Sequence, residues 1–132
     1  MDWKKDYSVG IRELDEQHKT VIECISSIER AVAQYDRHTV DAAIVRLVDL
    51  VKAHFTIEES LMRILDYPGL EDHADDHKQL SVHLKALQER FVPTDVFRNR
   101  IESVNGWWDT HVQKHDKSFA LHFLKYRALG KR

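Results

Sequence analysis

The chain has 132 residues, of which 20 are basic and 22 are acidic, so its formal net charge is −2. This length suits one domain with its own hydrophobic core. The near balance of charge argues against nucleic acid or anionic membrane as a partner. The single cysteine, Cys24, excludes an internal disulfide and is typical of a reducing compartment. With no leader-like or membrane-length apolar run, we expect a cytoplasmic protein that does not insert into membranes.

Apolar residues recur every three or four positions in four segments, which is the spacing of one helix face. We expect the first helix from about Ile11 to Gln34, after an irregular arm over residues 1–10. The second is expected near Val40–Leu65 with Thr39 as its N-cap, and the third near Leu70–Phe91.

The fourth helix is expected to begin near Asp95, after a turn in which Thr94 is the N-cap. Gly106 costs this helix about 1 kcal/mol relative to alanine, yet the apolar pattern continues past it. Four helices joined by short loops alternate in direction. The sequence therefore predicts an all-α fold, an up-down-up-down four-helix bundle, as one domain over residues 1–132.

Seven side chains that can bind a metal fall on the inward faces of these helices. They are His18, His54, Glu58, His73, His77, His111 and Asp116. Burying a polar group without a partner costs a few kcal/mol, and burying an isolated charge costs far more. A bound cation explains why five imidazoles and two carboxylates face one core.

The spacing of these residues indicates which of them share a helix face. His54 and Glu58 are four residues apart, as are His73 and His77, so each pair lies on one helix face.

In the fourth helix, regular spacing from His111 favours His115. The row through His115 continues with the polar Ser118, whereas the row through Asp116 continues with Phe119. We therefore predict that Asp116 points inward and His115 outward.

The composition of this set indicates its chemistry. Imidazole and carboxylate together suit iron, zinc, copper, nickel or manganese. Seven ligands exceed the four of a structural zinc site and suit two metals bridged by Glu58 and Asp116. Oxygen-activating di-iron bundles carry Glu-x-x-His motifs, which this sequence lacks. Neutral imidazoles stabilise high-valent iron less than that carboxylate-rich set, which favours reversible oxygen binding over oxygenation.

The segments around these residues resemble the hemerythrin family, particularly bacterial hemerythrin-like proteins, over about residues 3–120. The matching residues are Val9-Gly10-Ile11, Leu14-Asp15-Glu16-Gln17-His18-Lys19, His54-Phe55, Glu58-Glu59-Ser60-Leu61-Met62, His73, His77, Trp107, His111, Asp116 and Lys117. The resemblance implies two iron ions bridged by Glu58, Asp116 and an oxo or hydroxo group. It implies that one iron is held by His73, His77 and His111. It also implies that His18 and His54 hold the other iron, which keeps a position for dioxygen.

The resemblance also implies an apolar pocket that protects bound oxygen from water. By position, its walls are Val21, Phe55, Trp107, Trp108 and Val112. The family often has leucine where this chain has Trp108. A second indole either narrows the pocket or turns away from it.

The function implied is reversible dioxygen binding without catalytic turnover, in an oxygen carrier, store or delivery protein. An alternative is an oxygen or redox sensor, in which residues 117–132 form an extension that leads to an output domain. A di-iron oxidase or peroxide-consuming protein is disfavoured by the missing Glu-x-x-His motif. Besides dioxygen, the expected partners are such an output domain or an oxygen-consuming protein.

Overall fold

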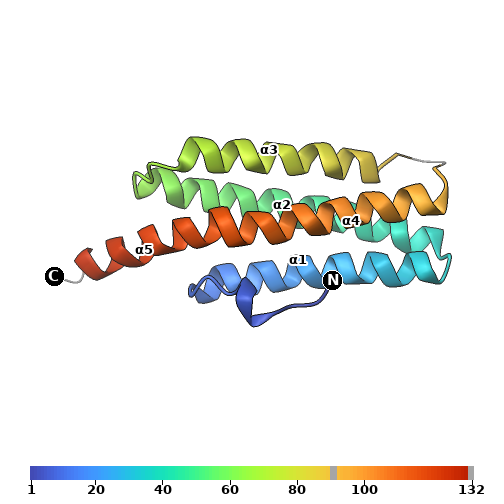
Figure 1. Ribbon diagram of the computed structural model, residues 1–132, viewed down its shortest axis with the longest axis horizontal. Coiled ribbons are helices and arrows are strands. Elements are labelled where there is room, and N and C mark those ends of the chain that lie inside the picture. The colour runs from blue at the N-terminus through green and yellow to red at the C-terminus, as the bar shows by residue number, and fades with distance from the viewer. Residues whose placement is uncertain (90–91, 131–132) are drawn as a thin grey trace.

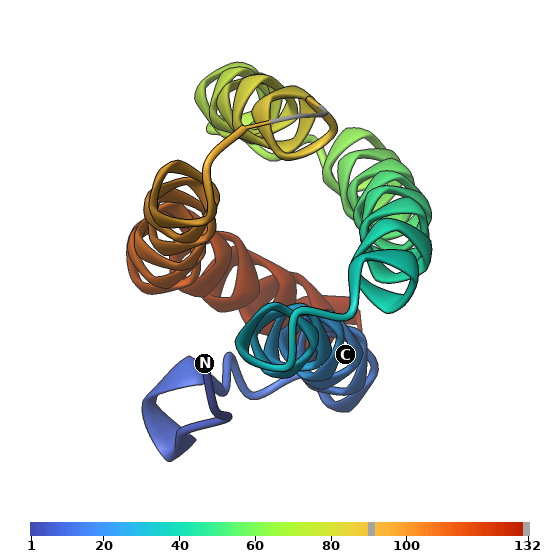
Figure 2. The same cartoon turned by 90° about the vertical axis from the view of Figure 1, so that its right-hand side faces the viewer.

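The computed structural model describes residues 1–89 and 92–130, and these residues form an all-α four-helix bundle (Figure 1). The helices are α1 (Arg12–Ala33), α2 (Arg37–Ile64), α3 (Leu70–Leu87) and α4 (Thr94–His111), followed by the π-helical turn η2 (Val112–Asp116) and α5 (Lys117–Gly130). Both α1 and α3 pack against α2 and α4, and the end-on view shows the four helices around one axis (Figure 2). The predicted up-down-up-down bundle is confirmed.

The start of α2 differs from the prediction because another residue is the N-cap. Asp36 accepts a hydrogen bond from the Thr39 backbone N–H at 3.2 Å and another from the Thr39 hydroxyl at 2.6 Å. The helix therefore begins at Arg37 rather than near Val40. The assignment of Thr39 as the N-cap was wrong, because its backbone N–H is one of the groups that the cap satisfies.

The connection between α3 and α4 also differs in detail. α3 ends at Leu87, whereas it was predicted to reach Phe91, which lies outside the described residues. Pro93, not Thr94, is the N-cap of α4. Pro93 has an extended backbone, and its carbonyl accepts the first helical hydrogen bond, from Phe97, at 3.0 Å. Thr94 is therefore the first residue inside the helix.

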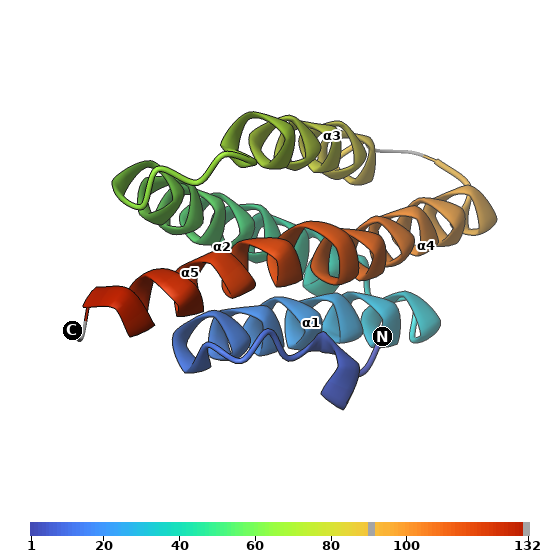
Figure 3. The same cartoon turned by 60° about the vertical axis from the view of Figure 1, so that its left-hand side comes forward.

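The fourth helix continues through η2 into α5 without a break in its path (Figure 3). Gly106 lies inside α4 and does not interrupt it, as expected from the apolar pattern. The residues predicted as a C-terminal extension are helical as far as Gly130.

The N-terminal arm is irregular apart from one 3-10 turn, η1 (Lys5–Tyr7). Tyr7 and Val9 are buried, so the arm contributes to the core. The side-chain amide of Gln113 donates to the carbonyl of Asp6 at 3.2 Å, which attaches the arm to η2.

The antiparallel order places the polar interior at one end of the bundle. The beginnings of α1 and α3 lie beside the ends of α2 and α4, and the predicted metal ligands come from those four stretches. The other half is filled by aliphatic side chains such as Ile28, Leu47, Leu84 and Ile101. Within the described residues, no helix combines the length and the apolarity needed to cross a bilayer.

Candidate metal centre

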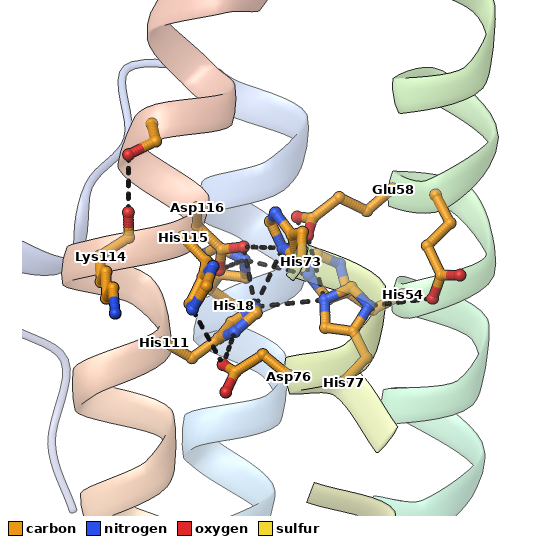
Figure 4. A network of polar contacts seen from close by, with 12 residues as sticks. His18, His54, Glu58, His73, Asp76, His77, His111, Lys114, His115 and Asp116 are labelled. Atoms are coloured by element: carbon orange, nitrogen blue, oxygen red, sulfur yellow. Dashed lines mark hydrogen bonds and ion pairs between the residues drawn. The ribbon is translucent and has the colours of Figure 1, made fainter. Parts of the chain in front are cut away.

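The structure brings all seven predicted ligands into one buried layer (Figure 4). Each of the seven side chains is at most 3% exposed. Their ligand atoms form two overlapping groups, and within each group the atoms lie within 4.8 Å of one another. The larger group contains Glu58, His73, His77, His111 and Asp116, and the smaller contains His18, His54, Glu58 and Asp116.

Glu58 and Asp116 belong to both groups, which therefore describe two adjacent positions that share two carboxylates. We call the first the three-histidine site and the second the two-histidine site. The two-histidine site has one imidazole fewer, and this difference is the main asymmetry of the centre.

A π-helical turn determines which residue of the fourth helix enters the layer. Hydrogen bonds to the fifth residue widen η2 by one residue relative to an α-helical turn. Asp116 consequently lies on the same side as His111, and its Oδ1 is 3.0 Å from His111 Nε2. His115 is half-buried beside the layer, with its Nε2 3.7 Å from Asp76 Oδ2.

The two shared carboxylates have only imidazoles as close polar neighbours among the described residues. Apart from the imidazoles, no described residue donates a hydrogen bond to the four oxygens of Glu58 and Asp116. Their nearest neighbours are imidazole nitrogens, and His73 Nε2 lies 2.6 Å from Glu58 Oε1 and 3.0 Å from Asp116 Oδ1. Buried carboxylates of this kind are costly unless a cation compensates them.

The imidazoles and carboxylates shift each other's pKa values. Burial raises the pKa of Glu58, but the adjacent imidazoles of His54 and His73 more than offset this, and the pKa lies well below its usual value. Burial and the charge of Glu58 raise the pKa of Asp116, while His111 lowers it to a net value below normal. Burial lowers the pKa of His73, but the two carboxylates raise it to about 9. Both carboxylates are therefore ionised at neutral pH.

Two further carboxylates orient the imidazoles of the three-histidine site. His77 Nδ1 lies 2.9 Å from Glu59 Oε2. His111 Nδ1 lies 2.6 Å from Asp76 Oδ2 (Figure 4). A carboxylate accepts only, so each Nδ1 carries a proton, and each imidazole, when neutral, presents a lone pair at its Nε2. The two Nε2 atoms are 3.2 Å apart. Facing lone pairs at this distance repel each other unless a positive charge lies between them.

At the two-histidine site, His54 has the same arrangement with an amide in place of the carboxylate. Gln17 Oε1 accepts from His54 Nδ1 at 2.5 Å, and His54 Nε2 faces His18 Nε2 at 3.1 Å. Buried imidazoles and unpaired carboxylates that converge in this way fit a pair of cations.

Gln17, Glu59 and Asp76 were not predicted from the sequence. Each is the immediate neighbour of a predicted ligand, and each orients a ligand on a different helix. The available signal was a polar residue at the border of an apolar stripe. That signal indicates a possible partner but does not identify the imidazole that it contacts.

Trp108 borders the two-histidine site. Its side chain is fully buried, and its ring meets His18 edge-on with the centroids 5.6 Å apart. The centroid of His54 is 6.3 Å away. The indole therefore does not turn away from these two histidines. Val21 and Val112, two other predicted pocket residues, are also buried.

The remaining predicted pocket residues contact the three-histidine site. Phe55 stacks on His77 with the ring centroids 3.6 Å apart and the planes nearly parallel. Trp107 is half-buried and stacks on His111 at 4.4 Å. These two rings limit the movement of two imidazoles.

Comparison with known proteins agrees with the site. The family model described as the Hemerythrin HHE cation binding domain matches residues 9–120. A bacteriohemerythrin of Stenotrophomonas maltophilia (strain R551-3) is 26% identical over 119 residues, covering 89% of this chain and 78% of that protein. A bacteriohemerythrin of Methylococcus capsulatus is 25% identical, with 90% and 93% covered, and a myohemerythrin of Theromyzon tessulatum is 26% identical, with 86% of each covered. The chain belongs to the hemerythrin family.

Proposed function

We propose that this protein binds dioxygen reversibly at a non-haem di-iron centre and acts as an oxygen carrier, store or delivery protein. Hemerythrins are a family of non-haem iron proteins that bind oxygen. The observation that carries the proposal is the unequal division of imidazoles around two shared carboxylates. Since the two-histidine site has one protein ligand fewer, it is the place for one small external ligand.

The ligand assignment follows from the two groups. One iron would be held by His73, His77 and His111, the other by His18 and His54, and Glu58 and Asp116 would serve both, since they belong to both groups. Two ferrous ions supply the two electrons that reversible dioxygen binding requires. The Nδ1 partners keep the imidazoles oriented with their lone pairs inward before any ion arrives.

Apolar residues beside the two-histidine site support binding without catalytic turnover. Trp108 is fully buried against His18, and Val21 lies on the same buried face of α1 as His18. These side chains exclude water and offer no acidic proton at neutral pH. Release of intact dioxygen is therefore favoured over its reduction, and we propose that the protein is not an enzyme.

The direct test combines metal analysis with an optical spectrum under nitrogen, then air, then nitrogen again. We expect about two irons per chain and an absorption that changes reversibly with oxygen. One zinc per chain with no oxygen-dependent spectrum would refute the proposal. We expect His73→Ala to lose iron, whereas His38→Ala is a matched control because His38 is exposed.

A sensor function is the second candidate, because Asp116 and α5 belong to one continuous helix. Any movement of Asp116 on oxygen binding is passed directly to the residues that follow it. For a sensor, we expect amide hydrogen exchange in α5 to differ between the oxygen-free and oxygenated forms. Identical exchange in both forms supports the carrier function.

A further inference from the structure

The residues that orient the imidazoles distribute charge unequally between the two sites. At the three-histidine site, His77 and His111 donate to the carboxylates of Glu59 and Asp76. These two acidic side chains are only 23% and 19% exposed. The charge is therefore added on one side of the centre, close to the ligands and partly shielded from water.

The two-histidine site receives no such charge. His54 donates to the neutral amide of Gln17, and the Nδ1 of His18 has no hydrogen-bond partner among the described residues. Glu58 and Asp116 belong to both sites and do not distinguish them. The carboxylates next to the imidazoles are thus the main electrostatic difference between the two positions.

A carboxylate that accepts the N–H of a metal-bound imidazole makes that imidazole a stronger donor. Stronger donation and nearby negative charge both stabilise the higher oxidation state of a metal. Salt screens this effect less for partly buried charges than for exposed ones. Oxidation is consequently favoured at the three-histidine site.

The two carboxylates are not equivalent. Glu59 also faces Arg63, at 3.8 Å, which offsets part of its charge. The contact of Asp76 with its imidazole is shorter, at 2.6 Å against 2.9 Å, and its other close neighbour is His115. The larger effect is therefore expected from Asp76.

We propose that Asp76 and Glu59 are positioning residues that make the iron of the three-histidine site the first to be oxidised. Loss of one electron from the diferrous protein, to an acceptor such as ferricyanide, then leaves Fe(III) at the three-histidine site and Fe(II) at the two-histidine site. The iron with one protein ligand fewer keeps its electron. This inference rests on the proposed di-iron function.

The test is a spectroelectrochemical titration of the iron-loaded protein, which resolves the two one-electron midpoint potentials. Asp76→Asn and Glu59→Gln remove a charge but keep an oxygen that accepts the imidazole N–H. The first potential belongs to the first oxidation of the diferrous protein, at the three-histidine site, and the second to the oxidation of the other iron. In both variants we expect the first potential to rise more than the second, with the larger shift in Asp76→Asn. The reciprocal variant Gln17→Glu is expected to lower the second potential more than the first.

Asp75→Asn is the matched control, because it removes the same charge from a neighbouring side chain that is 62% exposed. We expect it to move neither potential.

Equal shifts of both potentials in Asp76→Asn, or none, would overturn the inference while leaving oxygen binding intact. Failure of the parent protein to bind two irons would instead defeat the proposed function. If Asp76→Asn does not hold iron, Glu59→Gln and Gln17→Glu give the same comparison.

Discussion

His111 and Asp116 are five positions apart, yet His111 Nε2 lies 3.0 Å from Asp116 Oδ1. In an α-helix, the fourth residue after His111 would share its face, and that residue is His115. The π-helical turn η2 holds one extra residue and places the carboxylate inward instead. One added residue thus decides whether the fourth helix contributes a carboxylate or a second imidazole.

Deleting Lys114, an exposed residue of η2, should therefore be tolerated. After the deletion the carboxylate is the fourth residue after His111, so a regular α-helical turn keeps both facing the core. We expect the variant to retain two irons per chain, as measured by metal analysis.

Deleting Glu102 is the control, because this exposed residue lies in the regular part of α4. With no wide turn to absorb the change, every following side chain turns by about 100° around the helix. We expect this variant to lose its iron. Equal loss of iron from the two deletion variants would contradict the role given to η2.

Single substitutions in η2 separate its two candidate ligands. We expect Asp116→Ala to lose the bridged iron pair, since it removes one of the two carboxylates that belong to both sites. His115→Ala should keep the pair, because His115 is half-buried outside both ligand groups. The measurement is iron content together with the oxygen-dependent absorption. If His115→Ala loses the iron pair and Asp116→Ala keeps it, His115 is the ligand and the inward assignment of Asp116 is wrong.

The sequence was sufficient to predict the architecture because helix geometry alone relates spacing to direction. Residues such as Leu14, His18 and Ile25 recur at the helical period, and all three are buried. The ends of the helices were less predictable. Asp36 and Thr39 are both good N-caps, and caps of this kind differ by only a few tenths to about 1 kcal/mol.

The contacts between helices were beyond the sequence. Asp76 and His111 are 35 positions apart, and their contact depends on how far α3 and α4 slide and rotate against each other. Side-chain packing sets the position of the two helices relative to each other, and the residue pattern of a single helix does not predict it. The spacing of His73 and His77, by contrast, is fixed within one helix. The residues facing inward were therefore predictable, whereas the partners that orient them were not.

The metal-free protein should become less stable between neutral and alkaline pH. Burial lowers the pKa of His73, but Glu58 and Asp116 raise it to about 9, from 6.5 in the unfolded chain. A raised pKa means that the protonated imidazole stabilises the fold fully below pH 6.5. This contribution, at most about 3 kcal/mol, is lost as the pH rises through about 9. Urea unfolding of the metal-free protein across this range measures it.

His73→Ala is the control for this profile, since the variant lacks the titrating group and should show a flatter decline. At pH 6 it should also be less stable, because two buried carboxylates then face each other without the proton between them. A parent protein equally stable at pH 6 and at pH 10 would argue against this protonation. Iron binding has the opposite pH dependence, because the imidazole of His73 must lose its proton to bind a metal, so the affinity should rise until about pH 9.

Trp108 should limit the access of anions to the two-histidine site. Its indole lies edge-on to His18 and is fully buried, so Trp108→Leu opens space beside that imidazole. We expect azide to bind the diferric protein faster in this variant, as measured by stopped-flow absorption. Truncation of a buried tryptophan should also lower the free energy of unfolding by about 3 kcal/mol.

Trp107→Leu is the matched control because it removes the same atoms from the neighbouring position. Trp107 is half-buried and stacks on His111 at the three-histidine site, 4.4 Å from its ring centroid. This substitution should weaken the fold less and leave the azide rate close to that of the parent. If Trp107→Leu accelerates azide binding as much as Trp108→Leu, the external ligand does not enter beside His18, and the side assigned to it is wrong.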